Sequence, residues 1–228
     1  VYWLVPARAR PAVLTAFGVY FYWYYYPPHL LVIGVMTLAV FGLASAVRPG
    51  APRRRLAFAA GLAGCVGLLA YYKYQGFLVE TVTAVLGMAG VQAHVDPPRL
   101  RPPLGISFFT FEFVHYLVEV ARGTFAPATL PRFALFIMFF PTLICGPIKR
   151  FQQFSPQEYA ARRLDPADVH AGLERILFGF AKKTLGADPL APYTTWVLTH
   201  PRFYGPGQLW LAVYGYAFQL YYDFSGYS

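Results

Sequence analysis

The sequence alternates between long apolar runs and short, polar, mostly basic stretches. A helix that crosses the hydrocarbon core of a bilayer needs about 20 predominantly apolar residues. Runs of roughly this kind cover residues 12–26, 29–47, 56–72, 104–121, 133–148 and 208–224. The pattern predicts an all-α, polytopic membrane protein in which these runs are membrane-crossing helices.

Two further stretches are less apolar. Residues 77–91 contain Glu80 and two threonines, which predicts a tilted or partly interfacial helix. Residues 149–189 are polar and basic, and Asp168 is the predicted N-cap of an amphipathic helix that ends near Gly186. Such a helix is suited to an anionic membrane surface, and a short apolar segment over residues 190–200 follows it.

The distribution of arginine predicts an orientation. Arg8 lies before the first run, Arg53–Arg55 lie after the second, and the turn at Pro27–Pro28 has no basic residue. Because short cytoplasmic loops carry an excess of Lys and Arg, we expect both arginine clusters in the cytoplasm.

Composition excludes several classes of protein. The 228 residues are 57% hydrophobic and 13% charged, whereas a soluble domain has about 25% charged residues. The net charge of +9 does not indicate nucleic acid, because the basic residues lie in loops between apolar runs. The two cysteines have neither a disulfide pattern nor metal-site spacing. The sequence starts at Val1 and stops at Ser228 just after an apolar run, so we expect one membrane domain over 1–228 that is a piece of a longer protein.

One apolar run carries polar residues that lipid would exclude, namely Ser107, Thr110, Glu112, His115 and Glu119. Polar groups at membrane depth are tolerated only when they are buried in protein or face a wet cavity. Glu112, His115 and Glu119 share one helical face, where they either satisfy one another or line a pocket for proton transfer or ligand binding. Glu-x-x-His is half of a di-metal site, but the sequence has no second copy, so no metal is expected.

Two other polar groups end apolar runs. Lys149 and Arg150 follow a run broken by Pro141 and Pro147, where they form either an ordinary cytoplasmic anchor or an entrance for an anionic donor. Asp223 and Ser225 end the last run, where they either cap and turn the helix or line a pocket.

Four stretches in order carry a resemblance to a known family. They are PPLGISFFTFEFVHYLVEVARG, FFPTLICGPIKRFQQF, GLERILFGFAKKTLGADPLAPY and QLYYDFSGYS. Together they resemble the membrane-bound O-acyltransferase superfamily, in particular its bacterial alginate O-acetyltransferase branch and, more distantly, the D-alanyl transfer protein of teichoic acid synthesis. Lys149 follows Ile148 where related proteins often carry other residues, and Glu112 and His115 are not general to the superfamily.

The resemblance implies a multi-helix bundle around a central tunnel in the bacterial inner membrane. It implies transfer of an acyl group from a cytoplasmic thioester, such as acetyl-CoA or an acyl carrier, to a hydroxyl of an exported polysaccharide such as alginate. It also implies a partner protein outside the membrane and no bound cofactor. The tunnel and its mouth would be built by residues 105–110, 146–150 and 223–226.

The same resemblance places the catalytic histidine in a segment that follows the DFSGYS motif. No catalytic residue is therefore expected in this chain, and the chain alone is expected to be inactive. A transporter with broken helices and a non-catalytic scaffold of an export complex stay open as alternatives. The absence of a visible internal repeat favours the enzyme over the transporter.

Overall fold

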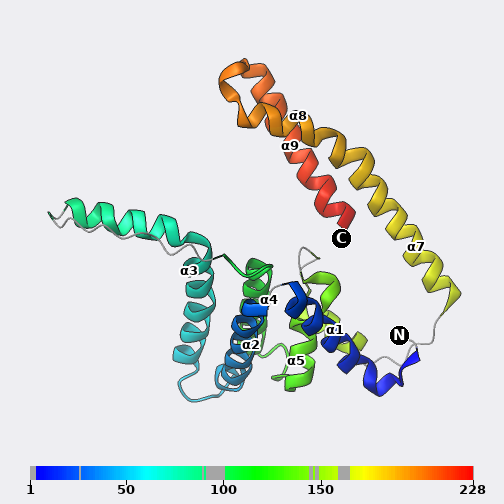
Figure 1. Ribbon diagram of the computed structural model, residues 1–228. Helices are drawn as coiled ribbons and strands as arrows, with labels where there is room; N and C mark the ends of the chain where they lie inside the picture. Colours follow the sequence, from blue (N-terminus) through cyan, green and yellow to red (C-terminus); the bar gives the residue numbers. More distant parts are fainter. Residues whose placement is uncertain are drawn as a thin grey trace. The chain divides into compact units, whose positions relative to one another are not determined.

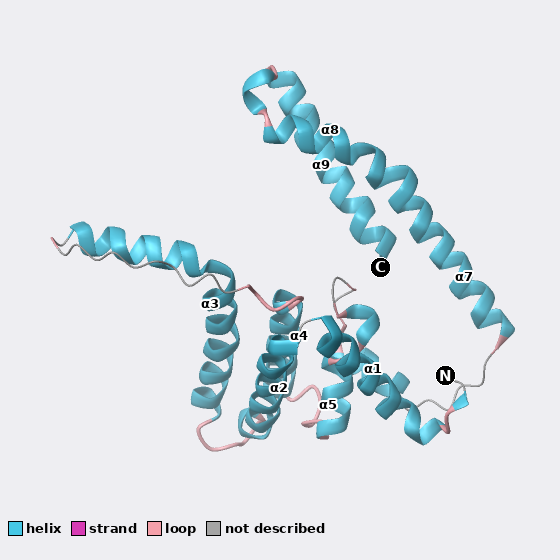
Figure 2. Cartoon of the chain, in the orientation of Figure 1, coloured by secondary structure: helices cyan, strands magenta, loops and turns pink. Residues whose placement is uncertain are grey.

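The computed structural model describes residues 4–25, 27–88, 90, 101–143, 146, 149–158 and 165–227. Helices and the loops between them make up this described part, and it contains no strand (Figure 2). The chain forms two compact units, with residues 1–144 and 148–160 in the first and residues 145–147 and 161–228 in the second. The expectation of a single membrane domain stays a prediction.

The first unit contains six α-helices and two short 3-10 turns in its described part (Figure 1). They are η2 (Ala7–Ala9), α1 (Arg10–Tyr25), α2 (Pro27–Val47), α3 (Arg54–Met88), α4 (Ile106–Arg122), α5 (Leu130–Ile137), η3 (Phe140–Thr142) and α6 (Phe151–Glu158). Helix α4 packs against α2 and α3, and α1 packs against α2 and α5. This arrangement buries Thr110 and Glu112 of α4 inside the unit.

Aromatic rings fill the core of the first unit. The ring of Tyr116 in α4 lies 4.3 Å from that of Phe133 in α5, tilted by 34°, and meets Phe151 of α6 edge-on at 5.2 Å, measured between ring centroids. The Tyr22 hydroxyl of α1 donates to the carbonyl of Leu104, 2.9 Å away, just before α4. These contacts fix α4 against three other helices of its unit.

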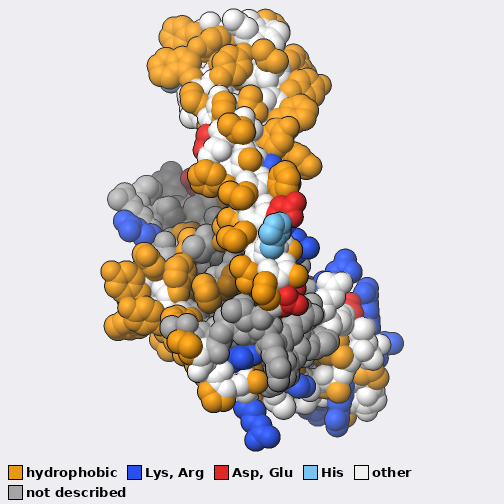
Figure 3. Space-filling model, turned by 90° about the vertical axis from the view of Figure 1, so that its right-hand side faces the viewer, with side chains coloured by type: hydrophobic (Ala, Val, Ile, Leu, Met, Phe, Trp, Pro, Cys, Tyr) orange, Lys and Arg blue, Asp and Glu red, His pale blue; other side chains and the backbone are white. Residues whose placement is uncertain are grey.

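The second unit consists of α7 (Pro166–Ala181), a π-helical turn η4 (Lys182–Ala187), α8 (Asp188–Thr199), a 3-10 turn η5 (Pro201–Phe203) and α9 (Pro206–Tyr227). Helix α9 lies antiparallel to the preceding helices and packs along α8, η4 and α7. Most of its apolar side chains, among them Trp210, Leu211 and Phe218, are exposed. Figure 3 shows hydrophobic side chains gathered over the second unit in the upper part of the view.

Two helices are long and apolar enough to cross a membrane, namely α2 and α3. Only 28% of the α2 window and 11% of the α3 window is buried, so neither is the enclosed core helix of a soluble protein. Their length and exposed apolar surface indicate a membrane protein.

Three expected boundaries were wrong. The runs at 56–72 and 77–91 form one helix, α3, which bends where Tyr74 has φ −118° and ψ 16°. The run at 133–148 is not one crossing helix, because α5 ends at Ile137 and η3 begins at Phe140 next to Pro141. Pro147 lies outside the described residues.

The third error concerns the basic helix. Its N-cap is Asp165, whose carboxylate accepts from the Ala167 backbone N–H at 2.9 Å, while Asp168 lies inside the first turn. A proline at the first helical position explains the shift, because proline has no N–H to be satisfied there. The helix also does not end near Gly186, since the π turn connects α7 directly to α8.

Candidate functional site

Helix α4 is positioned by two glycines with left-handed backbone. Gly105 precedes it with φ +73°, and a Cβ there would lie 2.4 Å from the Leu143 carbonyl oxygen. Gly123 ends it with φ +79° and returns its N–H to the carbonyls of Glu119 and Val120. A side chain is strained at such positions, so glycine lets α4 start against the segment that follows α5.

Glu112 and Lys149 form a buried ion pair between α4 and the residue that precedes α6 by two positions. The Lys149 Nζ atom lies 3.3 Å from Glu112 Oε1, and each side chain is only 8% exposed. The ammonium also donates to the backbone carbonyl of Phe136 at the end of α5. Lys149 therefore points into the packed interior of the first unit, although the sequence suggested an anchor or an entrance.

Three aromatic rings surround the same ammonium. Its Nζ atom lies 5.1 Å from the ring centroid of Phe136 and 5.5 Å from those of Phe139 and Phe154. Cations are attracted to the faces of aromatic rings at such distances. The three rings and the Glu112 carboxylate together offset the free-energy cost of removing the Lys149 ammonium from water.

A polar cavity of about 380 Å³ also lies within the first unit. Its walls are the side chains of His115, Glu119, Arg122, Arg150, Gln152 and Gln153. The expected entrance residue Arg150 thus meets the expected pocket residue His115, whereas Lys149, its neighbour in the sequence, lies elsewhere.

The charges of the cavity are not balanced by its one carboxylate. Glu119 Oε1 pairs with Arg122 at 3.2 Å, and Oε2 accepts from Gln152 Nε2 at 2.7 Å. Arg150 is exposed and has no ion pair among the described residues. His115 Nε2 and Gln152 Oε1 are buried and have no hydrogen-bond partner in the part of the chain that the structure describes.

The sequence left two hypotheses for Glu112, His115 and Glu119: they pair with one another, or they line a pocket. The structure does not show them paired with one another. Glu112 pairs with Lys149 and Glu119 with Arg122 and Gln152, which leaves His115 Nε2 without a partner among the described residues.

The other candidates on α4 have simpler surroundings. Thr110 is buried and donates to the carbonyl of Ile106 at 2.8 Å, within its own helix. Ser107 is half-buried one turn earlier. Neither side chain lines the polar cavity.

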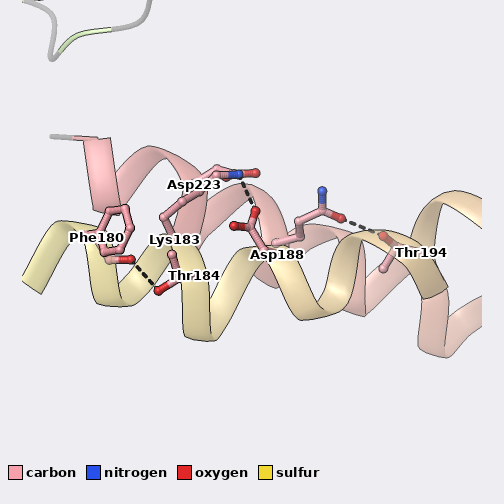
Figure 4. Close-up of polar contacts among 7 residues, drawn as sticks. Phe180, Lys183, Thr184, Asp188, Thr194 and Asp223 are labelled. Atoms are coloured by element: carbon pink, nitrogen blue, oxygen red, sulfur yellow. Dashed lines mark hydrogen bonds and ion pairs between the residues drawn. The ribbon is translucent and has the colours of Figure 1, made fainter.

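The second unit holds Asp223 and Ser225, which contact two consecutive lysines of the π turn. Lys183 Nζ lies 2.6 Å from Asp223 Oδ1 and 2.8 Å from Asp188 Oδ1 (Figure 4). Lys182 Nζ donates to Ser225 Oγ at 2.8 Å. The hydrogen bonds from Lys183 to Asp188 and Asp223 raise the pKa of the lysine above its usual value, so it stays charged at neutral pH.

A close helix contact accompanies these bonds. A Cβ on Gly179 of α7 would lie 2.3 Å from the Gly226 carbonyl oxygen of α9, so the two backbones approach directly. An amphipathic cavity of about 750 Å³ opens here, lined by apolar side chains such as Phe178 and Phe224 and by the two lysines. The observed bonds connect α9 to the π turn.

Several of these residues were not singled out from the sequence. They are Gln152, Lys183 and Phe136, one of the three rings around the Lys149 ammonium. Nothing in the sequence distinguishes a single glutamine, a lysine in a basic helix or one phenylalanine among 21 from its many equivalents. Their partners are distant in the sequence, so only tertiary packing identifies them. Among the described residues, no group of three His, Cys, Asp or Glu side chains could hold a metal ion.

No family model matches the sequence. Two similar proteins are the probable alginate O-acetylases AlgI of Azotobacter vinelandii and Pseudomonas aeruginosa, each 35% identical over 238 aligned residues. Each alignment covers 100% of this chain, but only 46% and 44% of the respective relatives. The chain therefore spans about half the length of the curated relatives it matches.

A third relative acts on a different polymer by name. The teichoic acid D-alanyltransferase of Bacillus subtilis is 35% identical over 144 residues, which cover 60% of this chain and 35% of the relative. These alignments confirm the resemblance that the four motifs carry, and over its full length this chain is a relative of the alginate O-acetylases, with the teichoic acid D-alanyltransferases more distant.

Proposed function

We propose that the complete protein containing this chain is a membrane-bound O-acyltransferase that acetylates a hydroxyl of an exported polysaccharide. The observation that carries the proposal is the alignment of the whole chain with proteins named alginate O-acetylases. Alginate is accordingly the first acceptor to test. The relatives are transferases by name, which supports an enzyme over the transporter or the scaffold.

In this proposal the protein crosses the bacterial inner membrane several times. The exposed apolar surfaces of α2 and α3 support a membrane location, and the arginines at both ends of the α1–α2 hairpin support a cytoplasmic position for those ends. The donor is an acyl thioester, either acetyl-CoA or a carrier protein, which reaches the protein from the cytoplasm as a substrate. The acceptor polysaccharide and a partner protein lie on the other side.

The chain described here contributes binding and positioning groups in this proposal, and the histidine that acts as general base lies in the segment after Ser228. A general base removes the proton of the acceptor hydroxyl as that oxygen attacks the thioester carbonyl. The buried polar groups of α4 support a role as part of the wall of a passage, because charged groups in such an apolar helix are costly unless they serve structure or function.

The test uses a bacterium that secretes alginate and lacks its own alginate O-acetylase. The complete coding sequence is expressed there, and acetyl esters on the secreted alginate are measured by proton NMR. We expect acetylation to return with the complete protein, but not with residues 1–228 alone. Unmodified alginate, although the protein is inserted in the membrane, would exclude alginate as acceptor, and unmodified envelope polysaccharides in general would refute the acyltransferase proposal.

A further inference from the structure

The polar cavity of the first unit has the composition of an anion site. Five of its six wall residues are neutral or basic, and the sixth, Glu119, already uses both carboxylate oxygens on Arg122 and Gln152. What is left to offer a ligand is mainly the guanidinium of Arg150, the remaining N–H groups of Arg122 and the amide of Gln153. Guanidinium groups present paired N–H donors that match the oxygens of a phosphate.

Two residues that line the cavity, His115 and Gln152, each carry a buried polar atom without a partner among the described residues. These atoms are His115 Nε2 and Gln152 Oε1, which are shielded from solvent. Leaving a buried polar group unsatisfied costs free energy.

The framework around the cavity holds these groups in place. Glu119 connects Arg122 of its own helix to Gln152 of α6. The ion pair of Glu112 with Lys149 connects α4 to the chain directly before Arg150. These contacts hold the backbone on either side of Arg150 in place. Because Lys149 is neutralised by Glu112 and surrounded by rings, Arg150 is the cation of this segment that a ligand can reach.

We propose that this cavity binds a phosphate group, with Arg150 as its principal contact. The inference rests on the proposed function, which requires a thioester donor. Coenzyme A and acyl carrier proteins share a phosphopantetheine arm, in which a phosphate is followed by a hydroxyl and amides. A phospholipid headgroup is the other source of the same chemistry.

The experiment measures binding, not transfer, on the complete protein in nanodiscs of zwitterionic lipid. Calorimetric titrations with coenzyme A, 4′-phosphopantetheine and pantetheine are compared for wild type, Arg150→Ala, Arg150→Lys and Arg202→Ala. Arg202 is an exposed arginine of the second unit and serves as the matched control. Loss of one charge-assisted hydrogen-bonded contact corresponds to about tenfold weaker binding.

We expect coenzyme A and phosphopantetheine to bind about tenfold more weakly to Arg150→Ala, with an intermediate effect for Arg150→Lys. Pantetheine, which has no phosphate, should not distinguish wild type from Arg150→Ala. Native mass spectrometry of the protein purified in detergent from the host membrane tests the lipid source. If Arg150→Ala leaves both phosphate ligands unaffected but loses the phosphatidylglycerol that co-purifies with wild type, the phosphate comes from lipid and the donor assignment is refuted. Equal binding of every phosphate probe by Arg150→Ala and Arg202→Ala would overturn the site.

These outcomes are separable from the fate of the proposed function. A protein that acetylates polysaccharide but binds its donor independently of Arg150 retains the function and loses the site. A protein that binds coenzyme A through Arg150 but transfers nothing retains the site and loses the function.

Discussion

Lys149 carries a positive charge into an aromatic interior, and Glu112 is its only carboxylate partner in the described part of the first unit. Removing one member of a buried ion pair leaves the other charge uncompensated, which is far more costly than removing both. The net contribution of the pair to stability is therefore measured by changing both residues together and comparing the result with the two single variants.

We expect Glu112→Gln to lower the free energy of unfolding by about 3–5 kcal/mol, because the ammonium keeps only a carbonyl and ring faces. Lys149→Met should be similarly destabilising. The double variant Glu112→Gln/Lys149→Met should recover most of the loss. Thermal unfolding of the complete protein in detergent measures all three.

The control for this cycle is Glu80→Gln, which changes an exposed carboxylate of α3 and should stay within about 0.5 kcal/mol of wild type. A double variant as unstable as the sum of its two single variants would show that the two residues contribute independently and that the pairing has no energetic role.

Among the helices, the approach of α7 to α9 depends on two glycines that face each other. Neither backbone can move away without breaking the bonds of Lys182 and Lys183 to α9. A methyl group added at Gly179 should therefore disrupt the contact between α7 and α9, whereas one added at Gly172 of the same helix should not.

Gly179→Ala should separate the end of α7 from α9, since its Cβ would lie 2.3 Å from the Gly226 carbonyl oxygen. Overpacking of this kind costs about 1–3 kcal/mol. Hydrogen exchange should accelerate in α7, η4 and α9. Gly172→Ala is the matched control, because a Cβ there meets nothing within 4 Å and alanine favours the helix. Equal exchange in both variants would contradict the close contact.

The start of α7 gives a second test. Asp165→Ala removes the carboxylate that accepts from the Ala167 N–H and should destabilise the first turn by about 1 kcal/mol. Asp168→Ala should have a smaller effect, since that residue makes no cap. Amide exchange of residues 167–169 reports the difference, and a larger effect of Asp168→Ala would restore it as the cap.

The sequence predicted helices well and their ends poorly. Apolar runs identify α2, α4 and α9, because burial or lipid contact is the dominant local signal. The N-cap was misplaced because Asp165 and Asp168 are both acceptable acceptors, and only the backbone at Pro166 decides between them. The polar candidates of α4 were found because charge in an apolar run is rare, but the partners Lys149 and Gln152 depend on folding that brings distant segments together.

At the scale of the whole molecule, we expect the arginine clusters at the two ends of the α1–α2 hairpin to lie in the cytoplasm. A single cysteine at Ala51, between α2 and α3, should react with a membrane-impermeant thiol reagent only after the cells are opened. A cysteine at His29, near the turn between α1 and α2, should react in spheroplasts with an intact inner membrane. Labelling in the reverse pattern would place the arginine clusters outside and contradict the cytoplasmic donor.

The bend of α3 at Tyr74 limits the length of its straight first part (Figure 1). At 1.5 Å per residue, the straight part from Arg54 to Lys73 is about 30 Å long, which equals the hydrocarbon thickness of a typical bilayer. Beyond the bend the helix changes direction and carries Glu80. If this straight part crosses the membrane, it is too short for a thicker bilayer, and the surrounding lipid has to thin to match it. We therefore expect the acyl-chain length of the host lipids to affect this protein.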